Sequence, residues 1–481
     1  MVFLITILIY LFVLTGIGIY KSRQVKTQVD FSVAGRSLSP WILVCTMLAV
    51  WIGTGSIVGY AGKTYETGLA ALILPVGSVI GMAILTRIAP RARSYEVDSV
   101  PEIIGSAYGQ TARALAVVAL VIAYMVIVSY QFNAGGAVLE VILTDETGRP
   151  LLSAQTATVI AAAFIITYTI LAGLMSLAYA DIVTGIIITA SLLIAFPVLW
   201  LKAGGWDGMA GSFSDMAKPD HMRFWGVYSK AEIINYCLPV FLLIMGDANQ
   251  YQRFFASRNA KGAKTATTFM IFAVLVVESL IILEAWVASS LIPDAENGKY
   301  VLIYAAKNFM PLALGIFFLI TVVGIIVSTA DSFLLVPATT VIRDIYLNYV
   351  NPNAPEKKVL FLSRLLVLVF GVIAYLVSLA FARSTTIFEK ALYAYTIYGA
   401  AITPCLVAAL FWKGATKQGA IASILTGTVT ALLWAQMGAL GEQVPAWARA
   451  LDAVLPAITV SVAALIIVSL LTNKKRAGTS S

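Results

Sequence analysis

Apolar runs long enough to cross a lipid bilayer recur along almost the whole chain. A membrane-spanning helix needs about 20 mostly apolar residues, because the hydrocarbon core is about 30 Å thick. By this rule the sequence predicts about thirteen spans, at residues 2–20, 40–61, 68–86, 111–142, 152–173, 179–201, 232–252, 266–292, 304–340, 358–382, 388–412, 417–437 and 451–472. We therefore expect an all-α integral membrane protein with one transmembrane domain over residues 1–481.

The composition excludes a soluble enzyme. Hydrophobic residues make up 60% of the chain and charged residues 12%, whereas a soluble domain is about 25% charged. The three cysteines, Cys45, Cys237 and Cys405, lie in apolar runs without a CxxC spacing, which indicates neither a disulfide framework nor a metal site. Neither GxxxxGK nor HExxH occurs, and the chain has no room for a nucleotide-driven pump's extra domain.

The basic residues predict the orientation of the chain. If the N-terminus lies outside, the inner loops hold most of the cations: Lys21, Arg23, Lys26, Arg87, Arg91, Arg93, Arg253, Arg258, Lys261, Lys264, Arg343, Lys357, Lys358, Lys413, Lys417, Lys474, Lys475 and Arg476. The outer loops mix cations with acids, as in TDETGR and PDAENGK. This is the positive-inside pattern, so we expect a cell-membrane protein with its N-terminus outside and its C-terminus cytoplasmic. The net charge of +8 follows from these loops and does not indicate a nucleic-acid partner.

Two predicted spans contain features of a broken helix. CTMLAVWIGTGS, residues 45–56, places Gly53 and Gly55 at mid-span. These glycines allow either close packing of two helices or an unwound segment whose carbonyls face a cavity, as in secondary transporters. IMGDANQYQR, residues 244–253, places Asp247 near the inner end of the seventh span. It marks either the helix end or a second broken helix.

Two further sites put carboxylates at membrane depth, where polar groups usually face the protein interior or a cavity. Asp181 opens the sixth predicted span, where an acid is also favoured by the helix dipole alone. VSTADSFLL, residues 327–335, puts Ser328, Asp331 and Ser332 on one helix face. Hydroxyl, carboxylate and carbonyl oxygens are the ligands of hard cations, whereas the alternative is hydroxyls bonded back to their own helix.

Several longer motifs, in this order along the chain, resemble one known family. They are DFSVAGRSLSPW from residue 30, AGLMSLAYADIV around Asp181, GDANQYQR in the seventh span, IIVSTADSFLLVPATTVIRDIY at residues 325–346, and PCLVAALFWKGATKQGA from Pro404. The chain is identified by them as similar to the sodium:solute symporter family. Members of that family carry proline, sugars, sialic acid, choline, pantothenate or iodide together with sodium.

The resemblance implies the inverted five-helix repeat of the bacterial leucine transporter. On this basis residues 1–30 form an extra N-terminal helix, 40–201 the first repeat, 232–412 the second repeat and 417–472 two C-terminal helices. The positions of the basic residues, taken without the resemblance, also predict that the two repeats cross the membrane in opposite directions.

The resemblance also implies the ion sites. Carried onto this sequence, the family's sodium site falls on Ala49, Ile52, Ile325, Ser328 and Thr329. A second sodium site or a proton site would fall on Asp181, Asp331 and Ser332. Sodium is thus the expected coupling ion, and no other cofactor is expected.

The solute is left open at this level. TMLAVWIGTG is similar to the corresponding helix of choline transporters, and a Trp face suits a quaternary ammonium. An amino acid such as proline, a choline-like amine, a carboxylate and a sugar are all compatible with the family. The predicted solute-binding residues are Trp51, Gly53, Thr54, Gln131, Asp247 and Tyr395.

We therefore expect a sodium-coupled symporter that imports a small organic solute by alternating access, and not an enzyme. The expected partners are sodium, the solute and the bilayer, with a monomer sufficient for transport. The alternatives are a membrane sensor domain and a passive channel of the same fold. The sensor is disfavoured because no signalling domain follows Lys475.

Overall fold

The computed structural model describes residues 2–22, 25–144, 149–171, 173–293, 298, 300–380, 386–437 and 451–478. Within these ranges the chain is helical, with two isolated bridges and no strand. The elements are α1 (Val2–Ser22), α2 (Gln28–Val33), η1 (Ala34–Arg36), α3 (Pro40–Trp51), η2 (Gly55–Tyr60), α4 (Ala61–Thr67), η3 (Gly68–Ile73), α5 (Val76–Arg93), α6 (Val100–Tyr108), α7 (Gln110–Ile142), α8 (Ala154–Leu171), α9 (Leu174–Lys202), α10 (Gly205–Asp215), η4 (Pro219–Met222), α11 (Lys230–Gly246), α12 (Ala248–Ala256), α13 (Ala260–Ser289), α15 (Val301–Asn308), α16 (Leu312–Val341), η5 (Ile342–Val350), α17 (Glu356–Ala380), α18 (Ile387–Ala401), α19 (Thr403–Phe411), α20 (Lys417–Met437) and α22 (Val454–Gly478).

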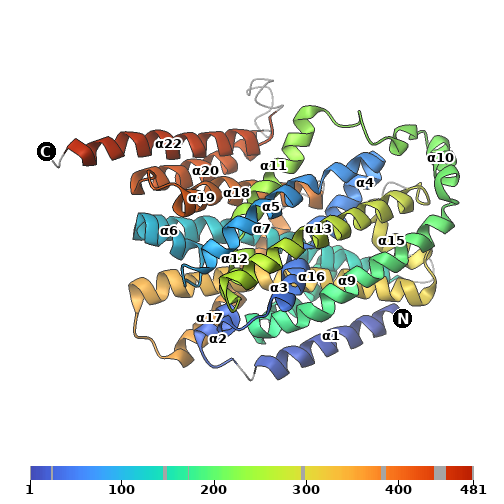
Figure 1. The fold of residues 1–481 in the computed structure, drawn as a ribbon. Helices are drawn as coiled ribbons and strands as arrows, with labels where there is room; N and C mark the ends of the chain where they lie inside the picture. Colours follow the sequence, from blue (N-terminus) through green and yellow to red (C-terminus); the bar gives the residue numbers. More distant parts are fainter. Residues whose placement is uncertain are drawn as a thin grey trace.

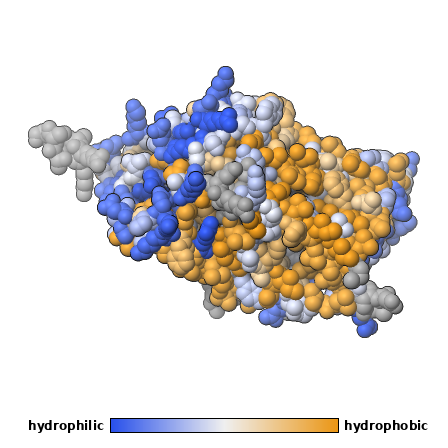
Figure 2. All heavy atoms as spheres, turned by 90° about the horizontal axis from the view of Figure 1, so that it is seen from below, coloured by the Kyte–Doolittle hydropathy of each residue, from blue (hydrophilic) through white to orange (hydrophobic). Residues whose placement is uncertain are grey.

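The long helices run side by side, and the chain begins and ends at opposite ends of the bundle (Figure 1). In Figure 2 a broad apolar region lies between two more polar ends of the molecule. Helix α17 contributes to the apolar exterior with exposed Phe361, Leu368 and Leu376. A surface of this kind suits contact with lipid, because single exposed apolar residues are normal in soluble proteins but broad apolar patches are not.

The described residues contain ten helices that are long and apolar enough to cross a membrane, or eleven with the bent pair of residues 40–51 and 55–73. The prediction of an all-α membrane protein is confirmed. The two other predicted spans, 68–86 and 417–437, correspond to α5 and α20, of 18 and 21 residues. Helix α5 begins later than predicted, so Arg87, Arg91 and Arg93 lie in its last turns and not in a loop.

Two further sequence predictions about charged residues are wrong. Asp181 does not open the sixth span, because α9 begins at Leu174 and Asp181 follows two turns later in its buried face. Arg253 does not lie in an inner loop. It belongs to α12, and its side chain is 0% exposed.

Some predicted loop residues lie outside the described part of the chain. These are Arg23, residues 145–148 of TDETGR and residues 294–297 and 299 of PDAENGK, together with the side chains of Lys21, Lys474, Lys475 and Arg476.

Two of the membrane helices are broken, which is one of the two alternatives that the sequence left open for each. The first break lies at residues 52–54, between α3 and η2, where the chain bends by 50°. The second lies at Asp247, between α11 and α12, where φ is −56° and ψ is 111°. The Asp247 side chain accepts a hydrogen bond from the backbone N–H of Asn249 at 3.2 Å, so it caps the helix that follows. Each break leaves backbone groups free for other partners.

Buried helix pairs surround the first break. Helix α3 packs against α9 and α16, and α16 packs against α7. Helices α5 and α13 form another close pair, and α11 packs against α18. Segments far apart in sequence therefore meet at mid-bundle, where α3 is interrupted.

Ion pairs connect several elements at the end of the bundle that holds α6. Arg36 bonds to Asp98 at 2.9 Å, and Arg343 bonds to Glu102 at 3.2 Å. Burial raises the pKa of the Asp98 carboxyl, although Arg343 and Arg36 beside it act in the opposite direction. Several elements are thereby tied together by charge at this end.

Candidate functional site

The break in α3 places an unusual concentration of oxygen atoms against α16. The Ser328 hydroxyl donates to the carbonyl of Ala49 at 3.0 Å. The Thr329 hydroxyl lies 3.5 Å from each of three carbonyl oxygens, those of residues 49, 50 and 52. One hydroxyl proton cannot satisfy three acceptors, so this group of carbonyl and hydroxyl oxygens suits a hard cation better than a hydrogen-bonded helix contact.

Gly53 allows the two helices to come this close. A Cβ atom at this position would lie 2.9 Å from Cγ2 of Thr329, which is too short for van der Waals contact. The Ser328 hydroxyl also lies 3.3 Å from the carbonyl oxygen of Ile325 in its own helix. All five residues predicted for the sodium site thus meet at one place. The carbonyl of Val50 joins them. Val50 was not predicted, because the resemblance implied only Ala49 and Ile52 in this segment and a backbone carbonyl gives no side-chain signal.

The three residues predicted for a second ion site form a neighbouring buried cluster. Thr46 of α3 donates to Asp181 of α9 at 2.5 Å. On α16 the Ser332 hydroxyl donates to Asp331 at 3.2 Å. Asp181 and Asp331 are 1% and 2% exposed. Two buried carboxylates in one cluster need compensating charge.

Arg253 supplies part of that charge from α12. Its guanidinium lies 3.8 Å from Asp181 and donates to Ser332 at 2.8 Å. It also contacts Asn249 at 3.3 Å. The sequence carried no clear signal for this placement, because an arginine at the end of an apolar run is typical of an inner loop.

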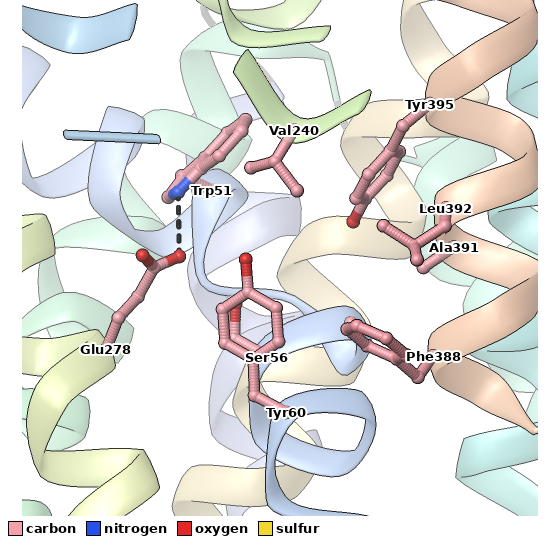
Figure 3. A pocket seen from close by; sticks show the side chains of 10 residues that line it. Trp51, Ser56, Tyr60, Val240, Glu278, Phe388, Ala391, Leu392 and Tyr395 are labelled. Carbon is pink, nitrogen blue, oxygen red and sulfur yellow. Dashed lines mark hydrogen bonds between the residues drawn. The ribbon is translucent and has the colours of Figure 1, made fainter. Parts of the chain in front are cut away.

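A pocket that Trp51 helps to line lies between α3, η2, α11, α13 and α18 (Figure 3). The pocket is narrow, with a volume of about 10 Å³, which is room for about one water molecule. Its walls are formed by Trp51, Gly55, Ser56, Tyr60, Val240, Glu278, Phe388, Ala391, Leu392 and Tyr395. Figure 3 shows the hydroxyl groups of Tyr60 and Tyr395 directed toward its centre.

The predicted solute residues fall into three groups. Trp51 and Tyr395 line the pocket. Gly53 and Thr54 lie at the break, where the Thr54 hydroxyl bonds to the Gln131 amide oxygen. Asp247 lies apart from the pocket lining and accepts a hydrogen bond from Tyr124 at 2.5 Å.

Sequence reasoning missed most of the pocket lining, including Ser56, Tyr60 and Phe388. Glu278 falls within the predicted span 266–292 but is not among the predicted solute-binding residues. Its intramembrane position was the signal that could have marked it as functional.

A broken membrane helix, with a cluster of hydroxyl and carbonyl oxygens at the break and a pocket beside it, is typical of ion-coupled secondary transporters. The sequence model of the sodium:solute symporter family matches residues 31–427, which is most of the chain. The chain belongs to this family, and its function is sodium-coupled symport of a small solute.

Known proteins with similar sequences cover nearly the whole chain. The osmoregulated proline transporter OpuE of Bacillus subtilis is 27% identical over 98% of this chain and 95% of its own. The sodium/proline symporter of Staphylococcus aureus is 24% identical over 98% of this chain and 93% of its own.

A solved structure shows the same fold. The outward-open, substrate-bound structure of a Na⁺-coupled sialic acid symporter superposes with a TM-score of 0.80 at 16% identity, covering 98% of both chains. The expected leucine-transporter-like fold is confirmed.

Proposed function

We propose that this symporter binds its coupling sodium ion at the break in α3 and its solute in the adjacent pocket. Ala49, Ile52 and Ile325 would supply carbonyl ligands, and Ser328 and Thr329 would supply hydroxyl ligands. The observation that carries the proposal is the approach of the Thr329 hydroxyl to three carbonyls of the broken helix at 3.5 Å.

The geometry gives a direct route for coupling. Trp51 lies between the carbonyls of Val50 and Ile52 in the chain, and its own ring lines the pocket. Sodium bound to these carbonyls would hold this segment in one conformation and thereby shape the pocket wall. A solute that prefers the same conformation strengthens sodium binding by the same factor, because coupling between two sites is reciprocal.

An amino acid such as proline is the first solute to test. The two relatives described above are proline transporters by name, and the similarity extends over nearly the whole chain. The pocket must widen to admit any solute, and a small solute requires less widening than a large one.

We propose for the membrane the arrangement that the sequence predicts. Residues 40–201 and 232–412 would form the two inverted repeats, each containing one of the broken helices. The N-terminus would lie outside and the C-terminus in the cytoplasm of a cell-membrane protein, with a monomer sufficient for transport. The start of α1 and the end of α22 lie at opposite ends of the bundle (Figure 1), which supports the placement of the two termini on opposite sides of the membrane.

The decisive experiment is uptake into proteoliposomes of purified protein. Labelled L-proline is supplied with an inward sodium gradient, with equal sodium on both sides, or with potassium in place of sodium. A symporter accumulates proline only with the inward gradient. A passive channel of the same fold would equilibrate proline in all three conditions, and a sensor domain would bind without flux.

Trp51→Ala is expected to raise the KM for solute about tenfold, while the sodium concentration for half-maximal uptake changes little at saturating solute. The substitution removes a pocket wall, and a loss of about 1.4 kcal/mol of binding corresponds to tenfold. Uptake kinetics against solute and against sodium measure the two effects separately. Trp41→Ala is the matched control, because Trp41 lies in the first turn of α3 and packs on Phe269 at a ring distance of 5.0 Å. Equal changes in both constants would place Trp51 in helix packing.

The cluster of Asp181, Asp331 and Ser332 is proposed to hold a second cation, a sodium ion or a proton. Arg253 balances one of the two carboxylates, so one negative charge remains in a buried site. A second sodium gives a Hill coefficient above one, and a proton gives uptake that changes with pH near neutrality. Asp331→Asn is expected to remove whichever dependence the wild type shows. Uptake curves against sodium and pH that match the wild type would contradict this proposal.

A further inference from the structure

Glu278 is a buried carboxylate at the edge of the pocket. It is not part of the proposed sodium site. It lies within the membrane helix α13, and 1% of the residue is exposed. Trp51 Nε1 donates to one carboxylate oxygen at 3.0 Å (Figure 3), and the Ser78 hydroxyl lies 2.7 Å from the other. Both partners are neutral, so the hydrogen bonds hold the carboxylate in place without balancing its charge.

No lysine or arginine balances Glu278 within the described ranges. The ion pairs formed there join other carboxylates, and the buried acidic cluster of Asp181 and Asp331 has Arg253 as its own partner. An isolated buried charge costs several kcal/mol, and ionisable residues inside membrane helices usually mark a substrate or ion pathway. Each carboxylate oxygen can accept about two hydrogen bonds, so Glu278 keeps capacity for a further donor.

The other walls of the same pocket are aromatic. Trp51, Tyr60, Phe388 and Tyr395 all line it. The rings of Tyr60 and Phe388 lie 6.1 Å apart and meet at 59°. Aromatic faces attract a desolvated cation by about 2 kcal/mol. A carboxylate without a fixed counter-charge and several aromatic rings therefore surround one small space.

We infer that Glu278 binds a positively charged nitrogen of the solute. The solute class is then a small molecule with an ammonium or quaternary nitrogen, such as an amino acid, a betaine or an amine. Sugars and carboxylates without a cationic nitrogen are not expected as solutes, because they offer Glu278 no positive charge. The inference rests on the proposal that this pocket is the solute site.

Glu284 offers a matched control on the same helix. It lies six residues after Glu278, is 0% exposed and has no hydrogen-bond partner at either carboxylate oxygen. It is not part of the pocket lining. Glu284→Gln removes a buried acid from α13 without altering the pocket. It therefore shows whether such a change in helix packing is by itself enough to affect transport.

The test uses proteoliposomes with an inward sodium gradient and four labelled probes. L-proline and glycine betaine carry a cationic nitrogen, whereas galactose and pyruvate do not. Wild type is compared with Glu278→Gln, Glu278→Asp and Glu284→Gln. We expect sodium-driven uptake of at least one cationic probe and of neither other probe. Glu278→Gln should raise the KM of that probe at least about tenfold, whereas Glu284→Gln should leave it unchanged.

Glu278→Asp keeps the charge and shows whether a shorter carboxylate suffices if the Gln variant folds poorly. Its KM should lie between wild type and Glu278→Gln. Sodium-driven uptake of galactose or pyruvate would overturn the inference, as would a wild-type KM in Glu278→Gln or failure to transport either cationic probe. Uptake of a cationic probe that depends on Glu278 but not on sodium would instead overturn the proposed coupling and leave the inference standing.

Discussion

Uptake by a variant carrying both Ser328→Ala and Thr329→Ala is expected to lose almost all of its stimulation by sodium. A hydrogen-bonding group that faces a charge contributes about 1.5–3 kcal/mol. Loss of two such ligands should therefore raise the sodium concentration for half-maximal uptake about a hundredfold or more. The protein should remain folded and inserted, because alanine fits a helix interior well.

The measurement is solute uptake against sodium concentration, with the fold checked by size-exclusion profile and thermal stability. Thr321→Ala is the control on the same helix. Its hydroxyl donates to the carbonyl of Phe317 at 3.0 Å, within α16, and does not reach α3. Sodium activation that is unchanged in the double variant would remove the assignment of this site.

Much of the proposed sodium site could be expected from the sequence, because its residues differ from the apolar residues around them in the predicted membrane helices. Gly53 at mid-span and the adjacent hydroxyls of Ser328 and Thr329 stand out from long apolar runs. The resemblance to a family then paired segments that lie 279 residues apart, as in the contact from Ser328 to Ala49. Their roles as ligands remain predictions.

The pocket could not be found in the same way. Glu278 is visible in the sequence as an intramembrane acid, but its partner Trp51 lies 227 residues away and Ser78 lies 200 residues away. Apolar wall residues such as Val240 look the same whether they face lipid, a neighbouring helix or a solute. Only the packing of α3, α11, α13 and α18 brings these side chains to one space.

Arg253 shows why charge patterns alone can mislead at the end of a span. Basic residues collect in inner loops, and Arg253 is followed by Arg258, Lys261 and Lys264, so the pattern assigns it to the same loop. The break at Asp247 instead starts a new helix, which turns Arg253 inward. The orientation predicted from the remaining cations does not depend on this one residue.

Arg253→Gln is expected to destabilise the protein strongly. The substitution leaves Asp181 and Asp331 in a buried cluster without their fixed counter-charge. Removing one partner of a buried ion pair costs about 3–5 kcal/mol, which is a large part of the stability of a typical protein. A marked fall in the thermal unfolding temperature of the purified protein should show it.

Removing the carboxylate charge of Asp181 as well tests whether the lost charge balance causes this destabilisation. Arg253→Gln combined with Asp181→Asn should recover most of the lost stability, because neither a guanidinium nor its nearest carboxylate is then left unpaired. Arg258→Gln is the control: Arg258 is exposed and donates to the carbonyl of Ser37 at 2.7 Å, so a small effect is expected. If Arg253→Gln and the double variant unfold at the same lowered temperature, then Arg253 stabilises α12 through its contacts with Asn249 and Ser332, and charge balance with Asp181 is not its role.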